Sequence, residues 1–203
     1  NCTFENNIAY FGGSIVIKDS KTTKNKIVGC TFINSTASTV LINSTVKAIV
    51  DHYSSVEEFC KGKGGAIFAR DKQISVINST FINCNGREGG AVFWDGGVNY
   101  QNTDPSKQTG TMGDDGVIIG STFIGNNATI GGAVCWTAPN GLINGSTFIR
   151  NNATLGGAVY WKGGVEYLRY AWNYKDAFAV HGNNGKVVNS EFIKNTATDG
   201  GAI

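Results

Sequence analysis

The chain has 203 residues, enough to bury a core in one domain or two. Its 28 glycines, two prolines and single methionine indicate a turn-rich chain with few helix formers, which favours β structure. The net charge of +2 comes from charges of both signs scattered along the chain, which excludes a basic stripe for nucleic acid. No stretch approaches the roughly 20 apolar residues of a membrane-spanning helix, so we expect neither nucleic-acid binding nor membrane insertion by this segment.

One motif recurs along the chain and defines its period. It begins at residues 2–17 as CTFENNIAYFGGSIVI, and the clearest copies are STFINCNGREGGAVFW, STFIGNNATIGGAVCW and STFIRNNATLGGAVYW at 79–94, 121–136 and 146–161. A last copy, SEFIKNTATDGGAI, covers 190–203. The Gly-Gly pair follows the Phe by eight residues in every copy, and the undecorated period is about 25 residues. Such self-similarity is the signature of a repeat architecture.

A further copy, which begins at Phe32, is ambiguous. Val40-Leu41 stand where the Gly-Gly pair is expected, and the next such pair is Gly64-Gly65. Phe32 and Phe81 are 49 residues apart, close to two periods, which favours a degenerate coil between them. The alternative is one coil that carries an insertion near residues 43–63. The sequence does not decide between the two.

Each period contains short runs of β-branched and aromatic residues separated by turn residues, as in VIIGSTFI, NNAT and GGAVCW. Three short strands in 25 residues are the content of one coil of a parallel β-helix, and stacked coils share one core. We therefore predict an all-β chain in which residues 1–203 form one single-stranded parallel β-helix segment of about seven coils. Because the chain opens without Met and stops inside the GGAI motif, we expect a fragment of a longer protein, with further coils at both ends.

Stacking places equivalent residues of successive coils in columns. The Phe column is predicted to point inward as an aromatic stack, with small residues two positions earlier on the same face. Asn side chains three positions after the Phe can hydrogen-bond one another and the backbone of the turns. The predicted structural ladder comprises Phe4, Phe32, Phe81, Phe123, Phe148, Phe192, Asn126, Asn151 and Asn195.

Two long insertions, at residues 94–116 and 161–185, both begin with W-x-G-G-V-x-Y. They start at the same place in the repeat, so we expect them to project from the same side of the rod, separated by one undecorated coil. Aromatic and Arg side chains on loops held by a rigid scaffold are typical anchors of recognition. The alternative is a private cap, in which these aromatic residues pack on the side of the helix. The candidate ligand-binding residues are Tyr100, Tyr167, Arg169, Tyr170, Trp172 and Tyr174.

The chain is dense in N-x-S/T sequons, which mark possible sites of N-glycosylation. If they carry glycans, the protein is exported. The alternative is that Asn, Ser and Thr simply serve as the turn residues of this fold. The glycosylation candidates are Asn1, Asn34, Asn43, Asn78, Asn127, Asn144 and Asn152.

The sequence contains no recognisable catalytic or metal-binding motif. None of the five cysteines forms a C-x-x-C pair, Cys135 is predicted to be a core residue, and the disulfide pairing stays open. Asp114 and Asp115 lack the alternating spacing of calcium ligands, and His52 and His181 have no nucleophile at a known motif spacing. We therefore predict no metal, no cofactor and no enzymatic activity. The alternative is a polysaccharide lyase or hydrolase, which needs carboxylates that converge on one face.

The segments FIGNNATIGGAV and FIKNTATDGGAI pair F-x-x-N with G-G-A-[IV] at a fixed separation. This pattern resembles the repeats of the polymorphic membrane proteins of chlamydiae, and it is also similar to those of adhesin-like surface proteins of methanogenic archaea. The resemblance spans nearly the whole chain, with departures at Ser35, Val40-Leu41, Cys84 and Gly86. It brings no shared catalytic residues.

The resemblance implies a right-handed parallel β-helix that is exported and exposed at a cell surface. It further implies a non-enzymatic adhesin that binds glycan or protein of a host or neighbouring cell, anchored by regions outside this segment. A purely structural surface spacer is the remaining alternative.

Overall fold

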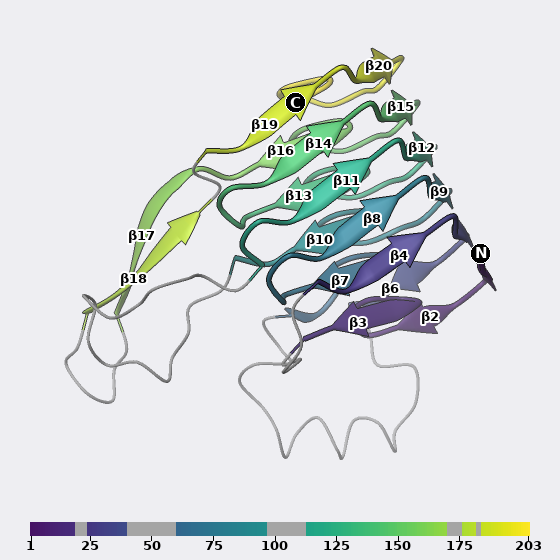
Figure 1. Ribbon diagram of the computed structural model, residues 1–203. Helices are drawn as coiled ribbons and strands as arrows, with labels where there is room; N and C mark the ends of the chain where they lie inside the picture. The colour runs from purple at the N-terminus through teal and green to yellow at the C-terminus, as the bar shows by residue number, and fades with distance from the viewer. Residues whose placement is uncertain (19–23, 40–59, 97–112, 170–175, 182–183) are drawn as a thin grey trace.

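The computed structural model describes residues 1–18, 24–39, 60–96, 113–169, 176–181 and 184–203. Most of its strands are three residues long and belong to three parallel sheets that run along a rod of stacked coils (Figure 1). We name the sheets after the residue type that marks each one.

The Phe sheet contains β1 (Thr3–Glu5), β5 (Thr31–Ile33), β9 (Thr80–Ile82), β12 (Thr122–Ile124), β15 (Thr147–Ile149) and β20 (Glu191–Ile193). The Trp sheet contains β3 (Ile15–Ile17), β7 (Ile67–Ala69), β10 (Val92–Trp94), β13 (Val134–Trp136) and β16 (Val159–Trp161). The Ile sheet contains β4 (Lys26–Val28), β8 (Ser75–Ile77), β11 (Val117–Ile119), β14 (Leu142–Asn144) and β19 (Lys186–Val188). Two further pairs are the parallel β2 (Ile8–Ala9) and β6 (Thr36–Ala37), and the antiparallel β17 (Gly164–Arg169) and β18 (Asp176–His181).

Successive coils stack in register, so that equivalent residues of the repeat become neighbours. In the Phe sheet, Phe123 pairs with Phe81 on one side and with Phe148 on the other. In the Trp sheet, Cys135 pairs with Phe93 and Tyr160, as its place in the repeat predicts. This pairing confirms the parallel β-helix expected from the sequence.

The coil that begins at Phe32 resolves the ambiguity of the sequence. Phe32 pairs directly with Phe81 although 49 residues separate them. The Gly-Gly pairs at residues 12–13 and 64–65 are also neighbours in the stack, because the Gly13 N–H donates to the Gly64 carbonyl oxygen. No degenerate coil therefore lies between the strands of Phe32 and Phe81, and the Phe sheet has six strands among the described residues. Most of the extra length, residues 40–59, lies outside the described residues.

The core of the rod is built on the predicted Phe column. Adjacent rings stack with centroids 4.7–4.9 Å apart and interplanar angles of 4° or less. The four inner rings are fully buried, whereas Phe4 and Phe192 at the two ends are half-buried. Because the stacking distance equals the spacing of paired strands, roughly 4.8 Å, the rings pack without distorting the sheet.

Polar ladders close the turns on both sides of the Phe sheet. Asn126 and Asn151 are fully buried, and the Oδ1 of Asn151 accepts from the backbone N–H and from Nδ2 of Asn126 at 3.0 and 2.9 Å. Asn195 repeats this arrangement one coil further on. A second ladder runs through the small residues before the Phe, where the Ser121 N–H donates to Ser146 Oγ at 3.2 Å. These bonds satisfy turn groups that the strands leave unpaired.

The Gly-Gly pair combines two separate requirements of the backbone. The first glycine, such as Gly131 with a φ of +65°, lies in the left-handed region that side chains disfavour. The second, such as Gly132, lies so close to Gly157 and Asn152 of the next coil that a Cβ would overlap their backbone atoms. Both positions are structural, as the repeat predicts.

All five cysteines are free thiols in this structure. Cys2 is exposed and the other four are buried. Burial raises the pKa of the Cys84 thiol to about 11, and burial also raises the pKa values of Cys135 and Cys60. A raised pKa leaves little of the reactive thiolate at neutral pH.

Alkylation of the folded protein with iodoacetamide at pH 8 is expected to modify Cys2 rapidly and the four buried thiols far more slowly. Mass spectrometry of the intact protein measures this as one added label, against five after unfolding in guanidinium. The Cys2→Ser variant serves as the control and is expected to stay unlabelled over the same interval. Rapid labelling of Cys84 in the folded protein would contradict the burial described above.

Candidate binding corner

Both long insertions leave the rod at one corner, which we call the exit corner. It comprises the turns that connect β10, β13 and β16 of the Trp sheet to β11, β14 and β19 of the Ile sheet. Trp94 and Trp161, where the insertions begin, are the two register partners of Trp136. The insertions therefore begin in the two coils on either side of the Trp136 coil, which itself carries no insertion. Figure 1 shows the hairpin β17–β18 beside the stack of coils, at this corner.

The predicted binding residues of the insertions are placed only in part. Tyr167 and Arg169 lie in β17, whose backbone pairs with β18 so that Tyr167 is opposite Phe178 and Arg169 is opposite Asp176. The hairpin gives the second insertion a regular two-stranded base. The other four candidates, Tyr100, Tyr170, Trp172 and Tyr174, lie outside the described residues.

A stack of Trp rings lies beneath the exit corner. The rings of Trp94 and Trp136 are 4.3 Å apart, and those of Trp136 and Trp161 are 4.9 Å apart. Each ring packs against a glycine just before the next strand of the Ile sheet, and a Cβ at Gly141 would overlap the Trp136 ring. The corresponding glycines of the neighbouring coils are Gly116 and Gly185. The corner therefore rests on stacked aromatic rings, of which Trp94 and Trp136 are fully buried and Trp161 is partly buried.

The indole N–H groups of this stack differ in whether they have a hydrogen-bond acceptor. Trp94 Nε1 donates to the carbonyl oxygen of Gly113, at the end of the first insertion, at 3.0 Å. Trp136 belongs to the undecorated coil, and its Nε1 is buried without an acceptor among the described residues. A buried donor without an acceptor costs about 1–3 kcal/mol.

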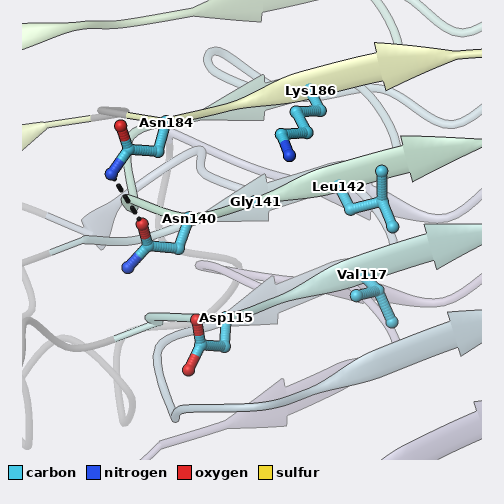
Figure 2. A pocket seen from close by; sticks show the side chains of 7 residues that line it. All are labelled: Asp115, Val117, Asn140, Gly141, Leu142, Asn184 and Lys186. Atoms are coloured by element: carbon cyan, nitrogen blue, oxygen red, sulfur yellow. Dashed lines mark hydrogen bonds between the residues drawn. The ribbon is translucent and has the colours of Figure 1, made fainter.

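An open groove lies on the outer face of the Ile sheet, next to the exit corner (Figure 2). Its volume is about 440 Å³. It crosses three successive coils, because its lining comes from β11, β14, β19 and the turns before them. The lining residues are Asp115, Val117, Asn140, Gly141, Leu142, Asn184 and Lys186.

A ladder of turn residues forms one rim of the groove. Asn184 Nδ2 donates to Asn140 Oδ1 at 3.1 Å, and Asn140 Nδ2 donates to Asp114 Oδ1 at 2.8 Å (Figure 2 shows the first of these bonds). Asp115, Asn140 and Asn184 have φ values of 53–58°, which Asn and Asp tolerate better than most residues. Asp114 Oδ1 also accepts from the Asp115 N–H, so this acidic pair closes a turn.

The groove was not predicted from the sequence, where of its residues only Asp115 was considered, as a calcium ligand, although a signal for it was present. A dipeptide of Asp or Asn followed by Gly precedes three strands of the Ile sheet, as Asp115-Gly116, Asn140-Gly141 and Asn184-Gly185. Such dipeptides mark tight turns. Their alignment across coils would have predicted the rim, because the register of the strands stacks them.

The outer face of the Trp sheet carries a cluster of charged side chains. Arg70 Nε donates to Asp95 Oδ2 at 2.8 Å, and Lys63 Nζ lies 3.3 Å from Glu88 Oε2 and 4.5 Å from the centre of the Phe93 ring. Both carboxylates therefore face cations rather than each other. Within the described ranges, no group of three or more His, Cys, Asp or Glu residues could hold a metal ion.

Apart from Asn1, the described sequon residues lie at turns, in isolated β-bridges or, for Asn144, at the end of β14. Asn34 and Asn78 are exposed and have positive φ, whereas Asn127 and Asn152 form an exposed ladder in which Asn152 Nδ2 donates to Asn127 Oδ1 at 2.9 Å. Asn144 accepts from a neighbouring Asn in the same manner. Asn1 is exposed at the first coil, and Asn43 lies outside the described residues. These positions give the Asn residues a structural role whether or not they carry glycans.

Comparisons with known proteins leave the function to be argued from this geometry. No family model matches the chain, and comparisons with curated proteins and with solved structures find no match. In the part of the chain that the structure describes, no helix is long and apolar enough to span a bilayer.

Proposed function

We propose that this chain is a non-enzymatic binding segment of an extracellular cell-surface protein, an adhesin-like rod that presents its two insertions to glycan or protein on a host or neighbouring cell. One observation carries the proposal. Both long insertions and the open groove converge on one corner of a rigid β-helix. Loops on a rigid scaffold are the usual place for recognition, because the scaffold supplies the position and the loops supply the contacts.

The proposal assigns the anchoring and the export signal to regions outside this segment, and further coils of the same protein are its proposed neighbours along the rod. The resemblance of the repeat to those of chlamydial and archaeal surface proteins motivates this placement. Glycans on the exposed sequons would be consistent with export, and mass spectrometry of Asn127 and Asn152 tests it directly.

The double variant Tyr170→Ala with Trp172→Ala, in the second insertion, is expected to reduce binding of the protein to cells or to arrayed glycans and proteins by at least about tenfold, because aromatic anchors dominate such interfaces. The control is Ile193→Ala, which alters a side chain that is 40% exposed on the Phe sheet, away from the corner. Thermal unfolding checks that both variants keep the fold. Unchanged binding of the double variant to every screened ligand would contradict the role of the second insertion.

The enzymatic alternative is tested by incubation with a panel of polysaccharides and detection of shortened or unsaturated products. Turnover that disappears on replacement of a single carboxylate would overturn the proposal in favour of a lyase or hydrolase. A protein that binds no ligand of any class would instead be a structural spacer.

A further inference from the structure

We propose that the groove beside the exit corner binds a short stretch of an extended, uncharged glycan chain. This inference rests on the proposed function and assigns a ligand class to the rigid part of the binding corner. The groove residues Asp115 and Asn184 lie within a few positions of the points where the two insertions return to the rod. A chain in the groove therefore lies at the foot of both insertions.

The shape of the groove favours a linear ligand. Its lining comes from three neighbouring coils, and the strands of stacked coils lie about 4.8 Å apart. The groove therefore extends along the axis of the rod, and its open side leaves room for a polymer to continue beyond it. Val117 and Leu142 are half-buried and supply an apolar floor for the faces of sugar rings.

The polar groups of the groove match hydroxyl groups. Asn140 and Asn184 carry amides that both donate and accept, Asp115 carries an acceptor, and Lys186 carries a donor. All four side chains are exposed, so they reach a ligand without a change of the fold. A sugar hydroxyl is donor and acceptor at once and can pair with each of them. One carboxylate and one ammonium give the lining no net charge, which favours an uncharged chain over an acidic one.

The same geometry disfavours a peptide as the ligand. Extended peptides usually bind by adding a strand to an open sheet edge, where the main chain supplies the affinity. The groove lies on a sheet face instead, and β11, β14 and β19 already pair with one another in register. One edge of β19 is open at the end of the described sheet, but the groove lies on the face of the sheet, where a ligand contacts side chains and the backbone of Gly141.

The unpartnered indole of Trp136 marks the same place from the inside. Its ring packs directly behind Gly141, a groove residue without a side chain, and its Nε1 has no acceptor among the described residues. The ring is fully buried, so a ligand in the groove lies on the other side of Gly141 from it. The indole N–H resonance of Trp136 is therefore a reporter of ligand in the groove.

The test compares two double variants that are matched in backbone and in hydrogen bonding. Asn140→Gly with Asn184→Gly removes both rim amides at positions of positive φ, which glycine accepts without strain. The control, Asn34→Gly with Asn189→Gly, also removes two exposed Asn residues of positive φ. In the native protein these two donate to Asn6 and Asn144 on other corners. Thermal unfolding of the two variants checks that they are equally folded.

Binding is measured by NMR titration with neutral hexasaccharides of glucose, mannose and N-acetylglucosamine, and with the hexamer of galacturonic acid. We expect a neutral hexasaccharide to shift the side-chain amides of Asn140 and Asn184, the Gly141 amide and the Trp136 indole. The groove variant is expected to bind it at least about tenfold more weakly, as the loss of two hydrogen bonds predicts, and the control variant to bind it normally.

The outcomes separate this inference from the proposed function. If the groove variant binds as the control does, or if only protein ligands bind, the groove inference is overturned and the proposed function stands. If the acidic hexamer binds more tightly than every neutral one, the assignment to uncharged chains is overturned. If neither glycan nor protein binds the native chain, both proposals are overturned.

Discussion

Replacing Gly132 with Ala is expected to lower the free energy of unfolding by about 4 kcal/mol or more, an unusually large effect for the addition of one methyl group. A Cβ at position 132 would overlap the Gly157 carbonyl oxygen and the backbone of Asn152 in the next coil. These are backbone atoms held in the ladders between coils, so they move away only if the coils separate. Urea denaturation followed by circular dichroism measures the effect.

The matched control for this substitution is Gly163→Ala. A Cβ at Gly163 meets no atom within 4 Å, and the residue is exposed. We expect its free energy of unfolding to stay within about 0.5 kcal/mol of the native value. Similar losses in the two variants would show that the close approach of the coils at Gly132 is not what the Gly-Gly pair provides.

Replacing Asn126 with Ala is expected to cost about 3 kcal/mol or more. Its Oδ1 accepts from the Cys84 N–H at 2.9 Å, and its Nδ2 donates to the Phe81 carbonyl oxygen at 3.2 Å and to Asn151 Oδ1 at 2.9 Å. The side chain is fully buried, so the substitution leaves buried polar groups without partners and without water.

The control is the adjacent residue, Asn127. It is exposed, and its Nδ2 donates to Asn85 Oδ1 at 3.2 Å. Water can replace this bond, so Asn127→Ala is expected to cost less than about 1 kcal/mol. Chemical denaturation of the two variants side by side gives the difference, and equal losses would refute a special role for the buried ladder.

The sequence predicted the interior of the rod well, because each interior position has a constant distance from the Phe. Phe123 and Asn126 recur at fixed places in the repeat, and the register of the coils then dictates their neighbours. The Trp stack was not predicted, although its three residues also lie at a constant distance from the Phe of their copies. Its contact with glycines could not be read from the repeat. The glycine that each ring contacts has a fixed distance to the next strand but not to the Trp, since insertions of different lengths lie between them.

The sequence also left open whether a degenerate coil or an insertion follows Phe32. The distance of 49 positions from Phe32 to Phe81 resembles two periods, and only the direct pairing of these residues excludes a coil between them. The groove could be anticipated only as a row of turns, because its depth depends on side chains of three coils that lie far apart in the sequence.

The undecorated coil that contains Trp136 has a consequence for how the two insertions act together. Its interfaces with both neighbours use the same ladders, so the chain can gain or lose a whole period here without disturbing the stacking. Each such change moves the two insertions apart or together by one strand spacing, about 4.8 Å. Under the proposed function, the number of coils between the insertions sets whether a single ligand can bridge both insertions or each binds its own.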